Sequence, residues 1–171
     1  MKHWKPWVIV SLLAVLAVAT VIFLFSAQSA DASSALSRGI AEKLIALFVP
    51  GYGDLTAARQ REILLVWGKA LRKTAHFAEY ALLGVTLTLF VRLRWRAWSW
   101  KKVMLIAWIA ATVYAGTDEL HQLFVSERGP GVLDVCLDSV GALAGIQAMS
   151  RLLRRREARK KGNASAMQSG L

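Results

Sequence analysis

Cysteine and acidic residues are scarce in this sequence. Cys136 is the only cysteine, which excludes an intrachain disulfide and a cysteine-based metal site. Because it lies in an apolar run, we expect it to be a small buried side chain. The 171 residues include 11 Asp and Glu against 22 Lys and Arg, and 56% of residues are hydrophobic. A chain this apolar and this basic needs a solvent other than water for part of its surface.

Regular alternation of apolar and polar residues is also missing, which excludes a membrane β-barrel. Instead the sequence has four apolar stretches of the length that a spanning helix needs, about 17–25 residues. We predict an all-α integral membrane bundle with transmembrane helices at 7–27, 75–92, 103–125 and 132–150. The first apolar run is longer than the core of a secretory signal, which is about 7–15 residues, so we interpret it as a retained helix.

The polar segment 28–74 separates the first two spans. It contains two amphipathic stretches, Ser34 to Val49 and Thr56 to Lys73, joined by a turn at 50–53. Thr56 is the expected N-cap of the second stretch. Two interpretations stay open: the helices lie in the plane of the membrane interface, or they fold over the bundle as a lid.

Lys and Arg are concentrated in residues 1–6, in the link after the second span and in the tail 154–171. With four spans these regions share one side, and the positive-inside rule predicts that this side is the cytoplasm. The segment 28–74 is then extracytoplasmic. No nucleic-acid-binding motif accompanies the tail, so we expect it to contact anionic lipid. Residues 162–171 are expected to be disordered.

Ionisable residues occur only in the outward halves of the last three spans. A charge at the centre of a spanning helix costs about 2.5–3.5 kcal/mol on insertion scales, so the acids should face inward and meet partners. We predict one polar pocket near the outer membrane surface, although the same cluster could be a structural lock. Its candidate binding residues are Gln28, Lys73, His76, Glu79, Tyr80, Asp118, Glu119, His121, Gln122, Arg128, Asp134 and Asp138.

Small residues follow the acids on the fourth span. Gly141 and Gly145 have the small-xxx-small spacing that lets another helix approach closely. We therefore expect a helix–helix contact on this face.

Four motifs together resemble the VanZ-like family of bacterial membrane proteins. They are Phe25-Ser26-Ala27-Gln28, Lys73-x-x-His76-x-x-Glu79-Tyr80-x-x-Leu83-Gly84, Asp118-Glu119-x-His121-Gln122, and Arg128-x5-Asp134-x3-Asp138-x-x-Gly141-x-x-x-Gly145. The resemblance implies a membrane domain over residues 7–153 in a bacterial cytoplasmic membrane, with Gly84 as a further packing position. The founding member is associated with low-level teicoplanin resistance, so the resemblance implies a cell-envelope role without naming a reaction.

Three functions fit these residues. The first is binding or modulation of a lipid head group, a lipid-linked wall precursor or a glycopeptide. The second is an intramembrane hydrolase or transferase with His76, His121, Asp118 and Asp134 as candidate catalytic residues. Its signal is weak, because HExxH and Gly-x-Ser-x-Gly are absent. The third is proton-linked transport. We predict no cofactor and no resident metal, although the enzyme hypothesis would allow a divalent cation, and the oligomeric state stays open.

Overall fold

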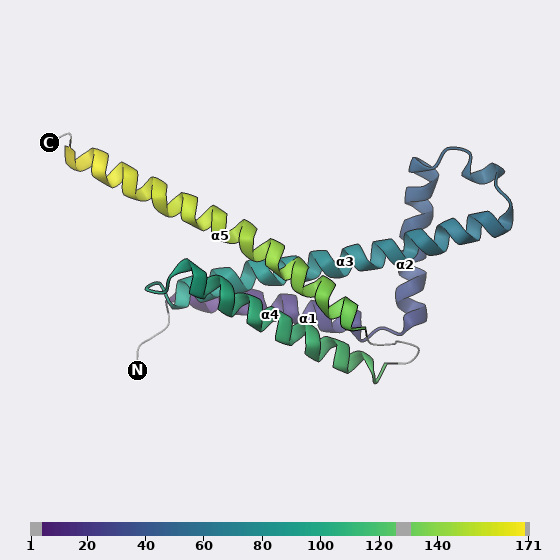
Figure 1. Ribbon diagram of the computed structural model, residues 1–171, viewed down its shortest axis with the longest axis horizontal. Helices are drawn as coiled ribbons and strands as arrows, with labels where there is room; N and C mark the ends of the chain where they lie inside the picture. The colour runs from purple at the N-terminus through teal and green to yellow at the C-terminus, as the bar shows by residue number, and fades with distance from the viewer. Residues whose placement is uncertain (1–4, 126–130, 170–171) are drawn as a thin grey trace.

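The computed structural model describes residues 5–125 and 131–169, and these form an all-α structure (Figure 1). The elements are α1 (Pro6–Ser26), α2 (Ala30–Phe48), the 3₁₀ helix η1 (Tyr52–Asp54), α3 (Ala57–Arg94), α4 (Trp100–Gln122) and α5 (Val132–Ser169). Helices α1, α3, α4 and α5 are long and apolar enough to cross a membrane. The predicted all-α class and the four spans are confirmed.

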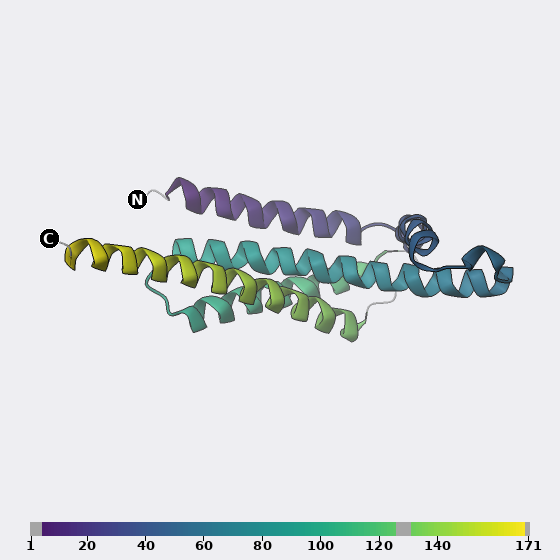
Figure 2. The ribbon, with the colours of Figure 1, turned by 90° about the horizontal axis from the view of Figure 1, so that it is seen from above.

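Helix α3 lies at the centre of the molecule and contacts every other helix (Figure 2). The buried residues of α1 are Val8, Ser11, Ile22 and Ser26, which recur on one face of a 3.6-residue helix. The rest of α1 is largely exposed and apolar, with Leu13 58% accessible. That pattern suits a helix that packs along one stripe and meets lipid elsewhere.

Small residues set the distance between the helices. On α4 the fully buried residues Val103, Ala107, Ala111 and Ala115 repeat every four positions. Ala111 and Ala115 pack with Tyr80 and Ile22 of the neighbouring helices in the core. In a membrane, burial of apolar surface supplies no driving force between helices. A stripe of short side chains instead lets the helix backbones approach closely.

Glycine backbones meet carbonyl oxygens where α3 crosses α5. A Cβ atom on Gly84 would lie 2.2 Å from the oxygen of Ala142, and one on Gly145 would lie 1.8 Å from the oxygen of Ala81. A Cβ atom on Gly141 would lie 2.6 Å from a carbonyl oxygen of α3. Real Cβ atoms do not approach so closely, so this crossing depends on all three glycines.

The segment between the first two spans differs from the prediction in one respect. The second amphipathic stretch is the first half of α3, a continuous helix of 38 residues. At about 1.5 Å per residue it is roughly 57 Å long, against about 30 Å of bilayer hydrocarbon. Its start therefore projects beyond the bundle. Thr56 caps it as predicted, with the Thr56 hydroxyl accepting from the Arg59 N–H at 3.4 Å.

Helix α2 crosses α3 steeply at the end of the bundle (Figure 1) and is viewed nearly end-on in Figure 2. Its fully buried residues Ala41 and Ile45 are four positions apart, and Leu36, Ile40 and Leu47 are exposed. The predicted turn between the helices is present, and Gly51 has a φ of 71° there, a conformation that favours glycine.

One further prediction is wrong. Cys136 is exposed on α5, because an apolar residue on a spanning helix can face outward as readily as inward. Disorder of the segment 162–171 stays a prediction, with α5 continuing to Ser169 and residues 170–171 outside the described residues. Residues 151–161 are all Arg, Lys, Leu, Glu or Ala, which are good helix formers, and the helix propagates through them.

Candidate functional site

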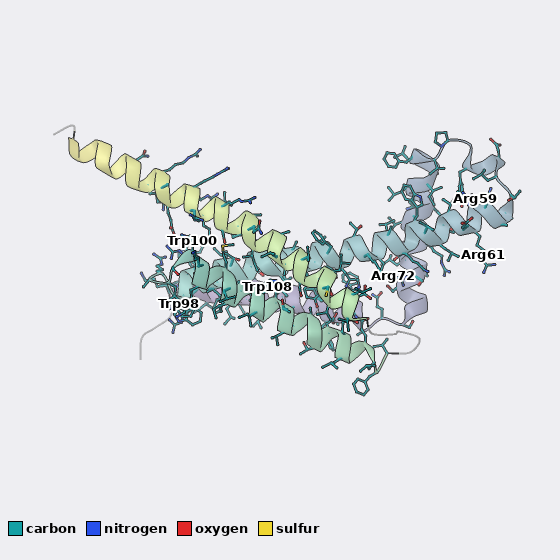
Figure 3. The ribbon with its side chains drawn as sticks, in the orientation of Figure 1. Arg59, Arg61, Arg72, Trp98, Trp100 and Trp108 are labelled. Atoms are coloured by element: carbon teal, nitrogen blue, oxygen red, sulfur yellow. The ribbon has the colours of Figure 1, made fainter. Side chains whose placement is uncertain are left out.

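The two ends of the bundle differ in chemistry. At one end, here called the basic end, Arg92, Arg94, Arg96, Lys101 and Lys102 surround the α3–α4 link. At the other, the polar end, α1 and α4 finish, α5 begins and α2 crosses α3. Trp98 and Trp100 lie at the basic end and Arg72 at the polar end (Figure 3).

Arg92 fixes the basic end. Its Nε and Nη2 donate to Glu157 of α5 at 3.0 and 2.8 Å, and its Nη1 donates to the carbonyl oxygens of Arg96 and Trp98 at 2.7 and 3.1 Å. The guanidinium also stacks 4.6 Å from the Trp100 ring. Arg72 lies 20 residues earlier on the same helix, which is about 30 Å along its axis. This separation matches the hydrocarbon thickness of a bilayer.

A pocket of about 170 Å³ opens where α2 crosses α3, and we call it the α2–α3 pocket. It brings together three predicted binding residues, Gln28, His76 and Glu79. Its lining is Phe25, Gln28, Ser33, Leu36, Ser37, Ile40, Leu71, Arg72, Ala75, His76 and Glu79.

Arg72 is a pocket residue that is absent from the binding residues predicted from the sequence. Its Nη1 donates to the hydroxyl of Ser34 on α2 at 3.0 Å, so Arg72 both lines the pocket and ties α2 to α3 (Figure 3). Arg72, His76 and Glu79 have i, i+4, i+7 spacing and share one face of α3. The spacing itself indicates Arg72, although this residue precedes the apolar run of the predicted span.

His76 and Glu79 lie side by side on the pocket wall. The His76 Nδ1 is 3.9 Å from a Glu79 carboxylate oxygen, and the two side chains are 21% and 22% exposed. At this separation the two groups are too far apart for a hydrogen bond to each other, but they can present a donor and an acceptor to one ligand.

A second group of predicted residues is buried behind the pocket. Tyr80, Asp118 and Asp138, from α3, α4 and α5, are 0%, 4% and 2% exposed. Among the described residues, the Tyr80 hydroxyl and one oxygen of each aspartate have no hydrogen-bond partner. Asp118 lies within electrostatic range of Asp138 and of Glu79, which connects this group to the pocket.

Gln122 and Glu119 hold the polar end together. The Gln122 Nε2 donates to the Ser26 hydroxyl of α1 at 3.0 Å and lies 3.4 Å from Asp118 Oδ2. A Glu119 oxygen accepts from the backbone N–H of Gly131 at 2.9 Å, just before α5. These buried contacts fix where α4 lies relative to α1 and α5.

Other predicted residues lie apart from the pocket. Lys73 follows Arg72 directly but binds Asp134 of α5 at 2.9 Å, with side chains 60% and 41% exposed. The His121 ring packs 4.7 Å from the Phe23 ring, and its Nε2 has no hydrogen-bond partner among the described residues. Arg128 lies outside the described residues.

The described part of the chain contains no group of three or more His, Cys, Asp or Glu side chains that could hold a metal ion. The sequence predicts that the candidate binding residues form one continuous pocket. The structure divides the candidates into the α2–α3 pocket, the buried acids behind it and the exposed Lys73–Asp134 pair.

The fold has the four long apolar helices of a multi-pass membrane protein, and a pocket with a mixed polar and apolar lining opens at one end of the bundle. The VanZ/LLP1 family model matches residues 11–154, and the chain belongs to the VanZ-like family. No curated protein and no solved structure matches the chain significantly.

Proposed function

We propose that this protein binds a lipid head group, or the head group of a lipid-linked wall precursor, in the α2–α3 pocket. The observation that carries the proposal is the pocket's lining, in which a guanidinium, an imidazole, a carboxylate and an amide stand beside an apolar wall. Such mixed linings are typical of ligand sites, where a few polar groups orient a molecule that apolar groups hold.

The position of the pocket supports a lipid ligand. Arg72 lies about one hydrocarbon thickness from Arg92 along α3, which puts its guanidinium at head-group depth when Arg92 is at the opposite surface. The exposed apolar residues Leu36, Ile40 and Leu47 of α2 favour the interface-plane interpretation of this helix. A helix in that plane would cover the pocket on its water side.

We further propose that the pocket faces the outer leaflet of a bacterial cytoplasmic membrane, with both termini in the cytoplasm. The start of α1, the α3–α4 link and the far end of α5 lie toward the basic end (Figure 1). The positive-inside rule then supports a cytoplasmic basic end. From the resemblance to the founder of the family, a link between head-group binding and teicoplanin resistance is part of this proposal.

The alternative is an intramembrane hydrolase or transferase on lipid-linked substrates. The pairing of His76 with Glu79 on the pocket wall favours it, because a carboxylate beside an imidazole can orient a general base. His76→Ala separates the two functions. Turnover of a lipid-linked substrate that His76→Ala abolishes, while the variant still binds that lipid, would make the protein an enzyme.

Arg72→Gln tests the binding proposal, with Arg61→Gln as its matched control. Arg61 is an exposed arginine on the same helix that does not line the pocket (Figure 3). Hydrogen bonds to a charged group contribute about 1.5–3 kcal/mol, so we expect Arg72→Gln to retain roughly one tenth or less of the wild-type lipid. Mass spectrometry of co-purified lipid is the measurement. Equal retention by wild type, Arg61→Gln and Arg72→Gln would reject the proposal.

A further inference from the structure

We infer that the bound head group is zwitterionic, with a phosphate at Arg72 and a primary amine at Glu79, as in phosphatidylethanolamine. This inference rests on the proposed function and names its ligand class. The observation behind it is the order of charges along the pocket wall, where two potential cations precede a carboxylate on one helix face.

The charge of the side chains that line the pocket changes sign with depth. Arg72 is nearest the end of the bundle, His76 lies one turn deeper, and Glu79 is about 10 Å beyond Arg72 along the helix axis. The Arg72 guanidinium is planar and always charged, which suits a phosphate. A second anionic group placed below it would be repelled by the Glu79 carboxylate of the lining. An ammonium at the same place is attracted by it.

The size of the pocket limits the ligand. Sites for drug-sized molecules measure about 300–1,000 Å³. The α2–α3 pocket, at about 170 Å³, is smaller. It suits a compact phosphate–amine group better than the sugar and peptide of a wall precursor. The apolar side chains of Leu36, Ile40 and Leu71 belong to the same lining. Because the phosphate joins the amine to the glycerol in such a lipid, the glycerol and acyl carbons would extend from the Arg72 side of the pocket.

The same lining favours a primary over a quaternary amine. Quaternary ammonium groups are recognised by cages of several aromatic rings, and Phe25 is the only Phe, Tyr or Trp among the described lining residues. A primary ammonium has three N–H donors. Glu79 and the amide oxygen of Gln28 provide acceptors for it within the pocket.

Native mass spectrometry in nanodiscs tests the inference with equal amounts of phosphatidylethanolamine and phosphatidylglycerol. Wild type should retain phosphatidylethanolamine about tenfold over phosphatidylglycerol, and Glu79→Gln should lower that ratio to about one. Arg72→Gln should lose both lipids. Glu62→Gln, on the exposed part of α3, is the control for removing a carboxylate and should keep the wild-type ratio.

The outcomes distinguish the two proposals. If wild type binds both lipids equally and Arg72→Gln loses both, the zwitterion inference fails while head-group binding stands. If Arg72→Gln keeps both lipids, head-group binding fails as well. An unchanged lipid ratio in folded Glu79→Gln also overturns the inference. Should that variant not fold, N-acetylated phosphatidylethanolamine makes the same test on wild type, because it lacks the charged amine and should bind about tenfold less.

Discussion

Helix α3 makes two different contacts on its two sides. Toward α5, Gly84 meets a carbonyl oxygen and leaves no space for a methyl group. Toward α2, Arg72 donates to the Ser34 hydroxyl, and Arg72, His76 and Glu79 line a pocket of about 170 Å³ between the two helices. The difference follows from side-chain length at the contact. Short residues let the helices pack, while long polar ones leave space for a ligand.

Gly145→Ala should produce the largest effect, because its Cβ would fall 1.8 Å from the oxygen of Ala81. The α3 and α5 backbones must then separate, and we expect a loss of more than about 3 kcal/mol in the free energy of unfolding. Unfolding by SDS titration measures it. Gly116→Ala is the control, since nothing lies within 4 Å of its Cβ position, and it should change stability by about 1 kcal/mol or less. Equal effects at both positions would contradict the close contact.

Ser26→Ala should have an intermediate effect. It removes the hydroxyl that accepts from the buried Gln122 amide, and such bonds between spanning helices contribute about 0.6–1.7 kcal/mol. Ser11→Ala is the matched control on the same helix, because the Ser11 hydroxyl only donates to the Val8 carbonyl oxygen of its own turn. SDS titration of both variants should show the larger loss for Ser26→Ala, and the reverse order would count against the α1–α4 hydrogen bond.

Lys73→Gln should have the smallest effect. Arg72 and Lys73 are adjacent, but Arg72 contacts α2 and Lys73 binds Asp134 of α5. The Lys73–Asp134 pair is exposed, and exposed pairs contribute about 0–1 kcal/mol. We expect near-wild-type stability and unchanged lipid retention by mass spectrometry. A loss of lipid comparable to that in Arg72→Gln would place the ligand on the α5 side.

Much of the fold was readable from the sequence. Spanning helices follow from long apolar runs, because unpaired backbone groups are too costly in hydrocarbon. The spacing of Gly141 and Gly145 indicated a close helix contact before a partner was known. His76 and Glu79 are predicted candidates because polar groups inside apolar runs are rare, and Gln28 is one because it follows the outer end of the first span.

The pocket was harder to predict. The second span is predicted to begin after Thr74, because the apolar run starts at that point. Hydropathy, however, does not mark where a helix begins. Because α3 is continuous from Ala57, Arg72 shares a face with His76. Its contact with Ser34 depends on the steep crossing of α2, which no local pattern specifies.

By itself, the sequence determined which segments are helices, which of them can cross a membrane and which faces hold the polar residues. These properties depend on local composition and on a fixed helical period. The tertiary structure alone decided that the candidates divide among an open pocket, a buried acid group and a surface ion pair. That division depends on crossing angles between helices, which are set by packing among residues distant in the chain.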